Sequence, residues 1–463
     1  MNPLSDKLHE ECAVFGASLK TPNAASVTYN GLIALQHRGQ EAAGIAIGGG
    51  NDIKVVKDLG LVAEVFGAGE MKKLEGSYSA IGHTRYSTTG CSSAGNVQPF
   101  FKEYLTGRIA VAHNGNITNS DEIRKKLENN GVHFSASSDS EAIASLIAYY
   151  SLCFNSATKG VVAAASELKG AFCLVVIAGD GKLIAVRDPN GYRPLCIGKS
   201  EDGVIIASET SALDTCGFEL IRDVKPGEVI VVENGEIVDS SIQLYSDTRG
   251  ICIFEYVYFA RPDSIIDGLS VFKARFEMGR RLARECPVEA DCVCGVPDSG
   301  LEAAMGYAFE SGLPYVTGFN KNRYIGRSFI FPSQAERANA VKMKLNPVRY
   351  NVEGKRIVVC DDSIVRGTTG VKMVNLLRHA GAKEVHLRIS SPPFIHTCYY
   401  GTDIGDESNL VANRKTVDEI RECFNADTLG YISLEGLLDA CKGCNLPFCI
   451  GCFNGEYGQK VEK

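Results

Sequence analysis

The residues best suited to chemistry lie in five short motifs between residues 12 and 141. The motifs are CAVFG at 12–16, LQHRGQEAAG at 35–44, GHTRYST at 82–88, AHNGNI at 112–117 and SSDSE at 137–141. Each one alone has an ordinary structural interpretation, since a cysteine in an apolar run is usually a core residue and Asn-Gly favours a turn. Their occurrence together in one stretch predicts nucleophilic chemistry by the thiol of Cys12.

A second group of polar residues follows an apolar run in VVCDDSIVRGTT at 358–369. Asp361 and Asp362 come at the carboxyl end of the predicted strand, and a Ser/Gly/Thr-rich loop leads into a predicted helix. Ligands of open α/β sheets bind at this position, where loop and helix N–H groups suit a phosphate. The two carboxylates suit ribose hydroxyls or a hydrated Mg²⁺ ion.

Seventeen cysteines are a high count for a chain of 463 residues. Most lie singly in apolar runs, as Cys173 does, and are predicted to be small buried side chains. The stretch CKGCNLPFCIGC differs because it holds two CxxC pairs, Cys441 with Cys444 and Cys449 with Cys452. Such spacing favours a metal site, and zinc is one interpretation.

The elements that must position these residues change in character near residue 246. Residues 12–245 hold many short strand-like runs with a few helices, including a strong hairpin at 170–188, and they predict stacked sheets. Beyond 246, strand, loop and helix alternate, which predicts a parallel sheet. A basic stretch at 326–350 is predicted to be a long loop between regular elements.

Composition excludes several classes of protein. The formal net charge is -7 and the pI is about 5.7, which argues against a nucleic-acid binder. No apolar run approaches the roughly 18 residues that a membrane span needs. The first eleven residues lack the apolar stretch of a secretory signal, so we expect a cytoplasmic protein with reduced cysteines.

The five N-terminal motifs resemble the glutaminase domain of class II, N-terminal-nucleophile amidotransferases. The resemblance implies an α+β sandwich of αββα layers over residues 12–245 and a mature chain that begins at Cys12. Residues 1–11 would then be a propeptide. Its removal frees the α-amino group of Cys12, whose pKa near 8 allows it to act as the base for the thiol.

The same resemblance implies the residues of a glutamine site. Arg85 would pair with the α-carboxylate of glutamine, Asp139 would hold its α-ammonium group, and Arg38 would lie on the wall of the pocket. Asn114 and Gly115 would form the oxyanion hole, through a side-chain amide and a backbone N–H.

Residues 358–369 resemble the phosphoribosylpyrophosphate (PRPP) signature of type I phosphoribosyltransferases, which implies an α/β domain over residues 246–401. The implied PRPP-binding residues are Asp361, Asp362, Ser363, Arg366, Gly367, Thr368 and Thr369. The implied Mg²⁺ ligands are Ser299, from GVPDSG at 295–300, with Asp361 and Asp362. The basic stretch resembles a lid over the pyrophosphate, with Arg327, Arg337, Lys342 and Lys344 as its cations.

One glutaminase domain followed by one phosphoribosyltransferase domain resembles the amidophosphoribosyltransferase family over nearly the whole chain. The implied reaction converts glutamine, PRPP and water to 5-phosphoribosylamine, glutamate and pyrophosphate, the first committed step of de novo purine biosynthesis. The ammonia would pass from Cys12 to the PRPP site through an internal, largely apolar channel. The resemblance also implies feedback inhibition by purine nucleotides and a homotetramer.

For the remaining residues, 402–463, the resemblance implies a tail that supplies ligands to a [4Fe–4S] cluster. Cys252, Cys398, Cys449 and Cys452 match that ligand set. Cys441 and Cys444 remain an alternative pair, and a zinc site of the four tail cysteines is a further alternative.

Three other classes fit the sequence less well. Glucosamine-6-phosphate synthases share the glutaminase but lack a DDSIVRGTT motif, and asparagine synthetases need an ATP-pyrophosphatase loop that this chain does not show. A purine-sensing regulatory protein with a phosphoribosyltransferase fold and no catalysis is the alternative function. It leaves the glutaminase motifs unexplained.

Overall fold

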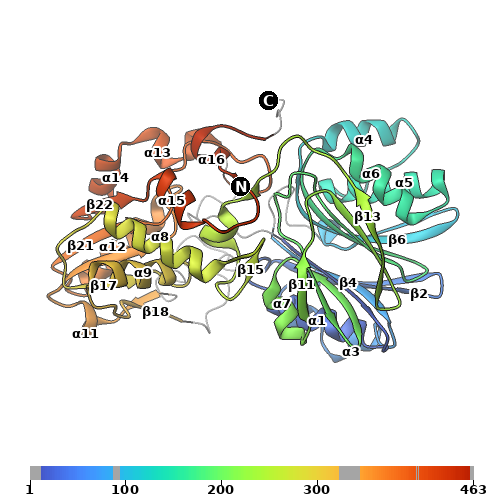
Figure 1. Cartoon of the computed structure of the whole chain (residues 1–463), viewed down its shortest axis with the longest axis horizontal. Helices are drawn as coiled ribbons and strands as arrows, with labels where there is room; N and C mark the ends of the chain where they lie inside the picture. The colour runs from blue at the N-terminus through green and yellow to red at the C-terminus, as the bar shows by residue number, and fades with distance from the viewer. Residues whose placement is uncertain (1–11, 87–93, 323–344, 403, 405, 459–463) are drawn as a thin grey trace.

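The computed structural model describes residues 12–86, 94–322, 345–402, 404 and 406–458. Figure 1 shows two lobes side by side, one formed by the blue and green N-terminal half and the other by the yellow and red C-terminal half. The basic residues Arg327, Arg337, Lys342 and Lys344 lie outside the described residues.

The first lobe contains two antiparallel sheets. The first sheet has the strand order β11-β9-β10-β1-β4-β2-β3. Its strands are β1 (Ala13–Leu19), β2 (Ala42–Gly49), β3 (Asp52–Leu59), β4 (Ser79–Arg85), β9 (Cys196–Ser200), β10 (Gly203–Ala207) and β11 (Glu219–Asp223). The second sheet has the order β13-β12-β8-β7-β6-β5. Its strands are β5 (Phe100–Tyr104), β6 (Gly107–Ile117), β7 (Gly170–Ala178), β8 (Leu183–Arg187), β12 (Glu228–Glu233) and β13 (Glu236–Gln243).

The two sheets face each other through a core of small and branched side chains, such as Val14, Ile81 and Val175. Helices α1 (Ala24–Ala34), α2 (Val62–Val65), α3 (Ala68–Lys72) and α7 (Thr210–Cys216) belong to the side of the first sheet. Helices α4 (Ser120–Glu128), α5 (Asp139–Phe154) and α6 (Ala157–Glu167) pack on the second sheet. The predicted αββα sandwich is therefore confirmed.

Local sequence signals explain two of these elements. The predicted hairpin at 170–188 is β7 paired antiparallel with β8, and Gly181 takes a φ of +90° in its turn, which glycine adopts without strain. Helix α5 begins where the Ser138 side chain accepts a hydrogen bond from the backbone N–H of Ser140. This cap fixes Asp139 at the first turn of the helix.

The second lobe is built on a parallel sheet of order β17-β20-β21-β22. Its strands are β17 (Cys292–Gly295), β20 (Arg356–Asp361), β21 (Glu384–Ile389) and β22 (Thr428–Tyr431). Helices α8 (Val271–Glu285), α9 (Leu301–Ser311) and α15 (Leu434–Ala440) share a core with Val293 and Val358. Helices α12 (Thr368–His379) and α14 (Val417–Phe424) share a second core with Cys294 and Val359. These residues directly follow Val293 and Val358 in their strands, so their side chains point to the opposite face of the sheet. Helices on both faces confirm the predicted α/β domain.

Short elements complete the second lobe. They are β14 (Ile251–Cys252), the π-helix Glu255–Phe259, β15 (Ile265–Ile266), β16 (Leu269–Ser270), β18 (Phe319–Lys321), β19 (Leu345–Pro347), α11 (Arg349–Val352), α13 (Val411–Arg414), β23 (Phe448–Cys449) and α16 (Gly451–Asn454). Two single turns of 3-10 helix lie at Ala94–Asn96 and Glu407–Asn409. No helix among the described residues is long and apolar enough to cross a membrane.

The last predicted segment, residues 402–463, is not a separate tail in the fold. It supplies β22, which pairs with β21 from His386↔Thr428 to Ile389↔Tyr431. A domain boundary at residue 401 would cut the parallel sheet, because its edge strand β22 lies beyond that residue. The sequence of β22, TLGY, is too short to show a strand pattern without its partner.

Candidate active site

The first site forms at one end of the first sheet, where β1, β4 and β2 lie next to each other. Ala13 pairs with Thr84, so Cys12 directly precedes β1 at the level of Arg85. Ala42 pairs with Arg85 on the other side, which brings the end of the HRGQE motif to the same edge. The antiparallel register thus joins three motifs that are far apart in the sequence.

Cys12 is half-buried, and its Sγ donates to the backbone oxygen of Tyr86 at 3.4 Å. Burial raises the pKa of its thiol, while the Tyr86 hydrogen bond and the charge of Arg85 lower it and the carboxylates of Asp139 and Glu41 raise it further. No histidine is among the groups with the largest effects on this pKa. The thiol therefore needs another base to become a thiolate at neutral pH.

Asn114 is fully buried in β6, and neither its Nδ2 nor its Oδ1 has a hydrogen-bond partner in the part of the chain that the structure describes. A buried amide without partners costs roughly 1–3 kcal/mol, so it is uncommon without a function. The next residue, Gly115, has a φ of +138°, and a Cβ there would lie 2.1 Å from the Ala171 oxygen. Only glycine fits at this position, so the backbone N–H of Gly115 comes directly after the buried side-chain amide of Asn114.

Arg85 and Asp139 supply the opposite charges of this site. Arg85 is 3% exposed, and its buried Nη1 has no hydrogen-bond partner among residues 12–86, 94–322 and the other described ranges. Asp139 accepts from the Ile117 N–H at 3.2 Å and from the hydroxyls of Ser138 and Ser140 at 3.3 Å. Arg85 and Asp139 both act on the pKa of Cys12, so the structure brings these three predicted residues together.

For Arg38, a place on the wall of the glutamine pocket stays a prediction. Its fully buried guanidinium pairs with Glu209 at 2.6 Å and with Glu255 at 2.6 Å, so carboxylates occupy both Nη atoms. Gly39 is the part of this motif that packs on β4, because a Cβ there would lie 2.6 Å from the Arg85 nitrogen. The Arg38 side chain therefore braces the two lobes, since Glu255 belongs to the π-helix of the second lobe.

The second site lies at the carboxyl ends of β17 and β20. Asp361 and Asp362 are 3% and 2% exposed, and the Ser299 hydroxyl donates to Asp362 Oδ1 from the loop after β17. The Ser363 hydroxyl donates to Asp362 Oδ2. Two loops that are 63 residues apart in the sequence thus meet at one carboxylate. The role of Ser299, Asp361 and Asp362 as Mg²⁺ ligands stays a prediction.

The predicted phosphate loop leads into α12. Gly367 is the residue before the helix and takes a φ of +88°, and a Cβ there would lie 3.0 Å from the Phe424 ring. Arg366 is half-buried, and the backbone of Thr368 and Thr369 forms the first turn of α12. N–H groups at a helix start can bind an anion.

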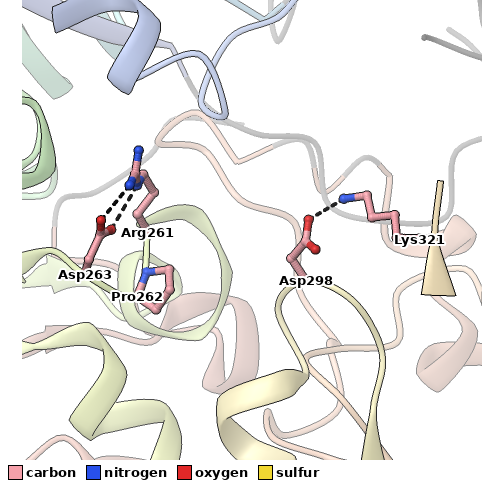
Figure 2. Close-up of a pocket in the computed structure, with 5 residues that line it drawn as sticks. All are labelled: Arg261, Pro262, Asp263, Asp298 and Lys321. Atoms are coloured by element: carbon pink, nitrogen blue, oxygen red, sulfur yellow. Dashed lines mark hydrogen bonds and ion pairs between the residues drawn. The ribbon is translucent and has the colours of Figure 1, made fainter. Parts of the chain in front are cut away.

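A pocket of about 710 Å³ opens beside this second site. Figure 2 shows its lining, with the pair Arg261 and Asp263 on one side and the pair Asp298 and Lys321 on the other. Arg261 also reaches the first lobe, because its backbone N–H donates to Glu209 Oε2 at 2.9 Å. The sequence motifs did not point to Arg261 or Lys321. Glu255 could have been found from the sequence, because it is an acidic residue inside the apolar run CIFEYVYF, and a charge in such a run indicates a buried ion pair.

The predicted cluster cysteines converge from distant segments. Cys252 of β14 and Cys449 of β23 are register partners in a parallel pair. Burial raises the pKa of the Cys452 thiol well above its ordinary value, and Cys252, Cys398 and Cys449 raise it further. Among the described residues, no group of three or more His, Cys, Asp or Glu side chains is arranged to hold one metal ion.

Cys441 and Cys444 lie apart from this group. The charge of Cys444 raises the pKa of Cys441 beyond the effect of burial, and the Cys444 sulfur accepts from the Tyr256 hydroxyl at 3.4 Å. The two cysteines therefore act on each other and on Tyr256. The charges that raise the pKa of Cys452 are those of Cys252, Cys398 and Cys449.

A sandwich with a half-buried thiol, joined to a parallel sheet with a phosphate-type loop, defines a glutamine amidotransferase that carries a phosphoribosyltransferase lobe. Residues 83–215 match the glutamine amidotransferase domain family. Amidophosphoribosyltransferase from Methanocaldococcus jannaschii is 48% identical over 465 residues, which cover 97% of this chain and 98% of the relative. Amidophosphoribosyltransferase from Bacillus subtilis is 46% identical over 462 residues, which cover 98% of this chain and 95% of the relative.

A solved structure agrees with these relatives. It is described as glutamine PRPP amidotransferase from B. subtilis complexed with ADP and GMP, and it has a TM-score of 0.88 and 43% identity, with 98% of each chain covered. The chain belongs to the amidophosphoribosyltransferase family.

Proposed function

We propose that this enzyme releases ammonia from glutamine at Cys12 and transfers it to PRPP at the Asp361–Thr369 loop. The glutamine-dependent formation of phosphoribosylamine is the activity of its family, and it starts purine biosynthesis. The buried amide of Asn114, which has no hydrogen-bond partner among the described residues, is the observation that carries the glutaminase assignment. The test is a coupled assay of glutamate and pyrophosphate release, with and without PRPP. Absence of both products would overturn the proposal.

In the glutaminase reaction, the Cys12 sulfur attacks the side-chain carbonyl carbon of glutamine while its proton moves to a base. Asn114 Nδ2 and the Gly115 N–H donate to the oxyanion of the tetrahedral intermediate. The intermediate collapses to a thioester and ammonia leaves with the proton. Water then hydrolyses the thioester to glutamate. Arg85 and Asp139 hold the α-carboxylate and the α-ammonium group.

The base is the freed α-amino group of Cys12, so residues 1–11 must be removed. Burial raises the pKa of the thiol, and a neutral amine next to it can take the proton that no histidine takes. Intact mass and N-terminal sequencing of active enzyme test this step. Full activity in a chain that retains Met1 would exclude the mechanism.

At the second site, oxygen ligands from Asp361, Asp362 and Ser299 fit Mg²⁺, which prefers hard oxygen donors. When bound, the ion neutralises charge on the pyrophosphate leaving group. The loop Ser363–Thr369 is placed to receive the 5′-phosphate at the start of α12. Arg261 and Lys321 line the pocket from its two sides and suit the diphosphate end of PRPP. Arg327 and Lys342 of the basic stretch remain proposed PRPP ligands.

Ammonia has to cross from Cys12 to the ribose without meeting water, since protonation would remove its nucleophilicity. An internal, largely apolar channel between the lobes is therefore part of the proposal. Stoichiometric escape of free ammonia during PRPP turnover would count against it.

The four thiols of Cys252, Cys398, Cys449 and Cys452 fit a [4Fe–4S] cluster. Such a cluster takes four thiolates and spreads them over a larger volume than a single ion does. Cys441 and Cys444 sit against Tyr256 instead, which disfavours a zinc site of the four tail cysteines. A visible spectrum with iron and sulfide content tests the assignment. About four irons per chain, lost in a Cys452→Ser variant and kept in Cys444→Ser, is the expected result.

The remaining proposals concern partners and location. The structural relative bound to ADP and GMP supports purine nucleotides as feedback inhibitors of this enzyme. A homotetramer is proposed by family resemblance, and sedimentation measures it. No described cysteine forms a disulfide, in keeping with a reducing cytoplasmic location.

A further inference from the structure

The oxyanion strand of the first lobe is held by a backbone segment of the second lobe. Asn116, two residues after Asn114 in β6, donates from Nδ2 to the Tyr399 oxygen at 2.9 Å. The two residues are 283 positions apart in the sequence. This hydrogen bond joins the strand that carries the oxyanion hole to Tyr399–Gly401 of the other lobe.

Gly401 lies beside the same strand. It has a φ of +111°, and a Cβ there would lie 3.4 Å from the Gly115 carbonyl carbon and 3.4 Å from Asn116 Cβ. It would also lie 3.0 Å from Arg193 Nη2. The positive φ favours glycine at this position, and the segment lies beside Gly115, whose N–H is a proposed oxyanion donor.

The segment itself is fixed on its other side. Arg193 Nη2 donates to the Tyr400 oxygen at 2.6 Å, and the Tyr192 and Tyr400 rings stack at 4.2 Å. Tyr400 is 3% exposed, so this contact is a packed junction. A backbone held at three successive residues can act as a rigid support for β6.

From these contacts we infer that Asn116 and Gly401 are positioning residues for the oxyanion hole. They act on glutamine hydrolysis across the lobe boundary, through the orientation of Asn114 and Gly115. The inference rests on the proposed glutaminase function of Cys12. A small displacement of an oxyanion donor weakens transition-state stabilisation more than substrate binding. The effect should therefore fall on kcat and leave KM for glutamine nearly unchanged.

The test compares Asn116→Ala with Asn119→Ala in the full-length enzyme. Asn119 is a matched control, because its Nδ2 also donates to a backbone oxygen at 2.9 Å, that of Glu167, but within the first lobe. We expect Asn116→Ala to lower kcat for glutamine hydrolysis about tenfold, with KM within twofold, whereas Asn119→Ala leaves kcat within twofold. Gly401→Ala should resemble Asn116→Ala.

A second measurement reports on the oxyanion hole itself. The γ-aldehyde of glutamate adds to a cysteine thiolate and places a tetrahedral oxyanion in the hole, so its inhibition constant should rise about tenfold in Asn116→Ala. Synthesis from free ammonia and PRPP, which bypasses glutamine, should stay within twofold.

Unchanged kcat and aldehyde affinity in Asn116→Ala would overturn the inference, as would equal losses in the Asn119→Ala control. Failure of the underlying function gives a different result. If Cys12 were not the nucleophile, the parent enzyme and its Cys12→Ala variant would hydrolyse glutamine at the same rate.

Discussion

The two sites differ in how far their polar side chains are paired within the protein. In the first lobe, the buried amide atoms of Asn114 and the buried Nη1 of Arg85 have no hydrogen-bond partners among the residues that the structure describes. In the second lobe, Asp362 already accepts from two serine hydroxyls, and Asp298 pairs with Lys321. The first site thus has polar atoms without partners among the described residues, whereas the polar groups of the second site are paired with one another.

The chemistry of the substrates explains the difference. An unsatisfied neutral amide costs roughly 1–3 kcal/mol, which a fold can tolerate in exchange for a donor already in place. An uncompensated buried carboxylate costs far more, so the carboxylates of the second site need partners before a metal and a polyanion arrive. We therefore expect mutations in the first site to act through the transition state, and those in the second through binding of PRPP.

The largest expected effect is that of Cys12→Ala. Removing the nucleophile should lower glutamine-dependent synthesis at least about 10⁴-fold, because no other group can form the thioester. Synthesis from free ammonia should persist, since Cys12 lies in the other lobe from the PRPP loop. Parallel assays with glutamine and with ammonium chloride measure both. Cys153→Ala, at an exposed thiol, is the control, and glutamine-dependent activity in Cys12→Ala would refute the assignment.

Asn114→Ala should have the next largest effect. Loss of one oxyanion donor typically lowers kcat 100- to 1,000-fold, and KM for glutamine should change little. Thermal stability should not fall, because the substitution removes a buried amide that no described residue hydrogen-bonds. Steady-state kinetics and a melting curve measure the two quantities. A loss of stability with unchanged kcat would mean that Asn114 is structural.

Local pattern and chemistry predicted much of this molecule. Alternation and turn residues predicted β1, β4, β6 and the β7–β8 hairpin, and the apolar run before Asp361 and Asp362 predicted β20. These features depend on short stretches of sequence, so they can be predicted from one sequence alone.

The features that the sequence did not predict depend on partners far along the chain. Arg38 stands in a motif beside the glutamine site, yet it pairs with Glu209 and Glu255, which lie 171 and 217 residues away. Strand β22 is a strand only because β21 lies beside it. Asn116 and Gly401 meet across the lobe boundary, and no periodicity in either segment indicates that contact.

Asp362→Asn tests the charge-balanced site. Without this carboxylate, Mg²⁺ and the ribose lose an anionic oxygen, and PRPP-dependent synthesis should fall on the order of 10- to 100-fold with either nitrogen source. Glutamine hydrolysis without PRPP should remain, which separates this variant from Asn114→Ala. Initial rates at varied Mg²⁺ and PRPP provide the measurement. A selective loss of glutamine-dependent synthesis, with ammonia-dependent synthesis intact, would contradict the expected role of Asp362.

Lys321→Met should have the smallest effect, and it tests whether pairing inside the pocket limits what a cation contributes there. Lys321 is 33% exposed and already paired with Asp298, and such partly exposed pairs are worth about 1 kcal/mol or less. We therefore expect KM for PRPP to rise only about three- to fivefold, and the difference from the parent enzyme to shrink at high salt, because exposed charges are screened. Lys73→Met, which breaks the exposed pair with Glu70 in the first lobe, should leave this KM unchanged. A 100-fold rise that is insensitive to salt would mean that Lys321 meets PRPP as a desolvated, unbalanced charge, and the contrast between the two sites would then disappear.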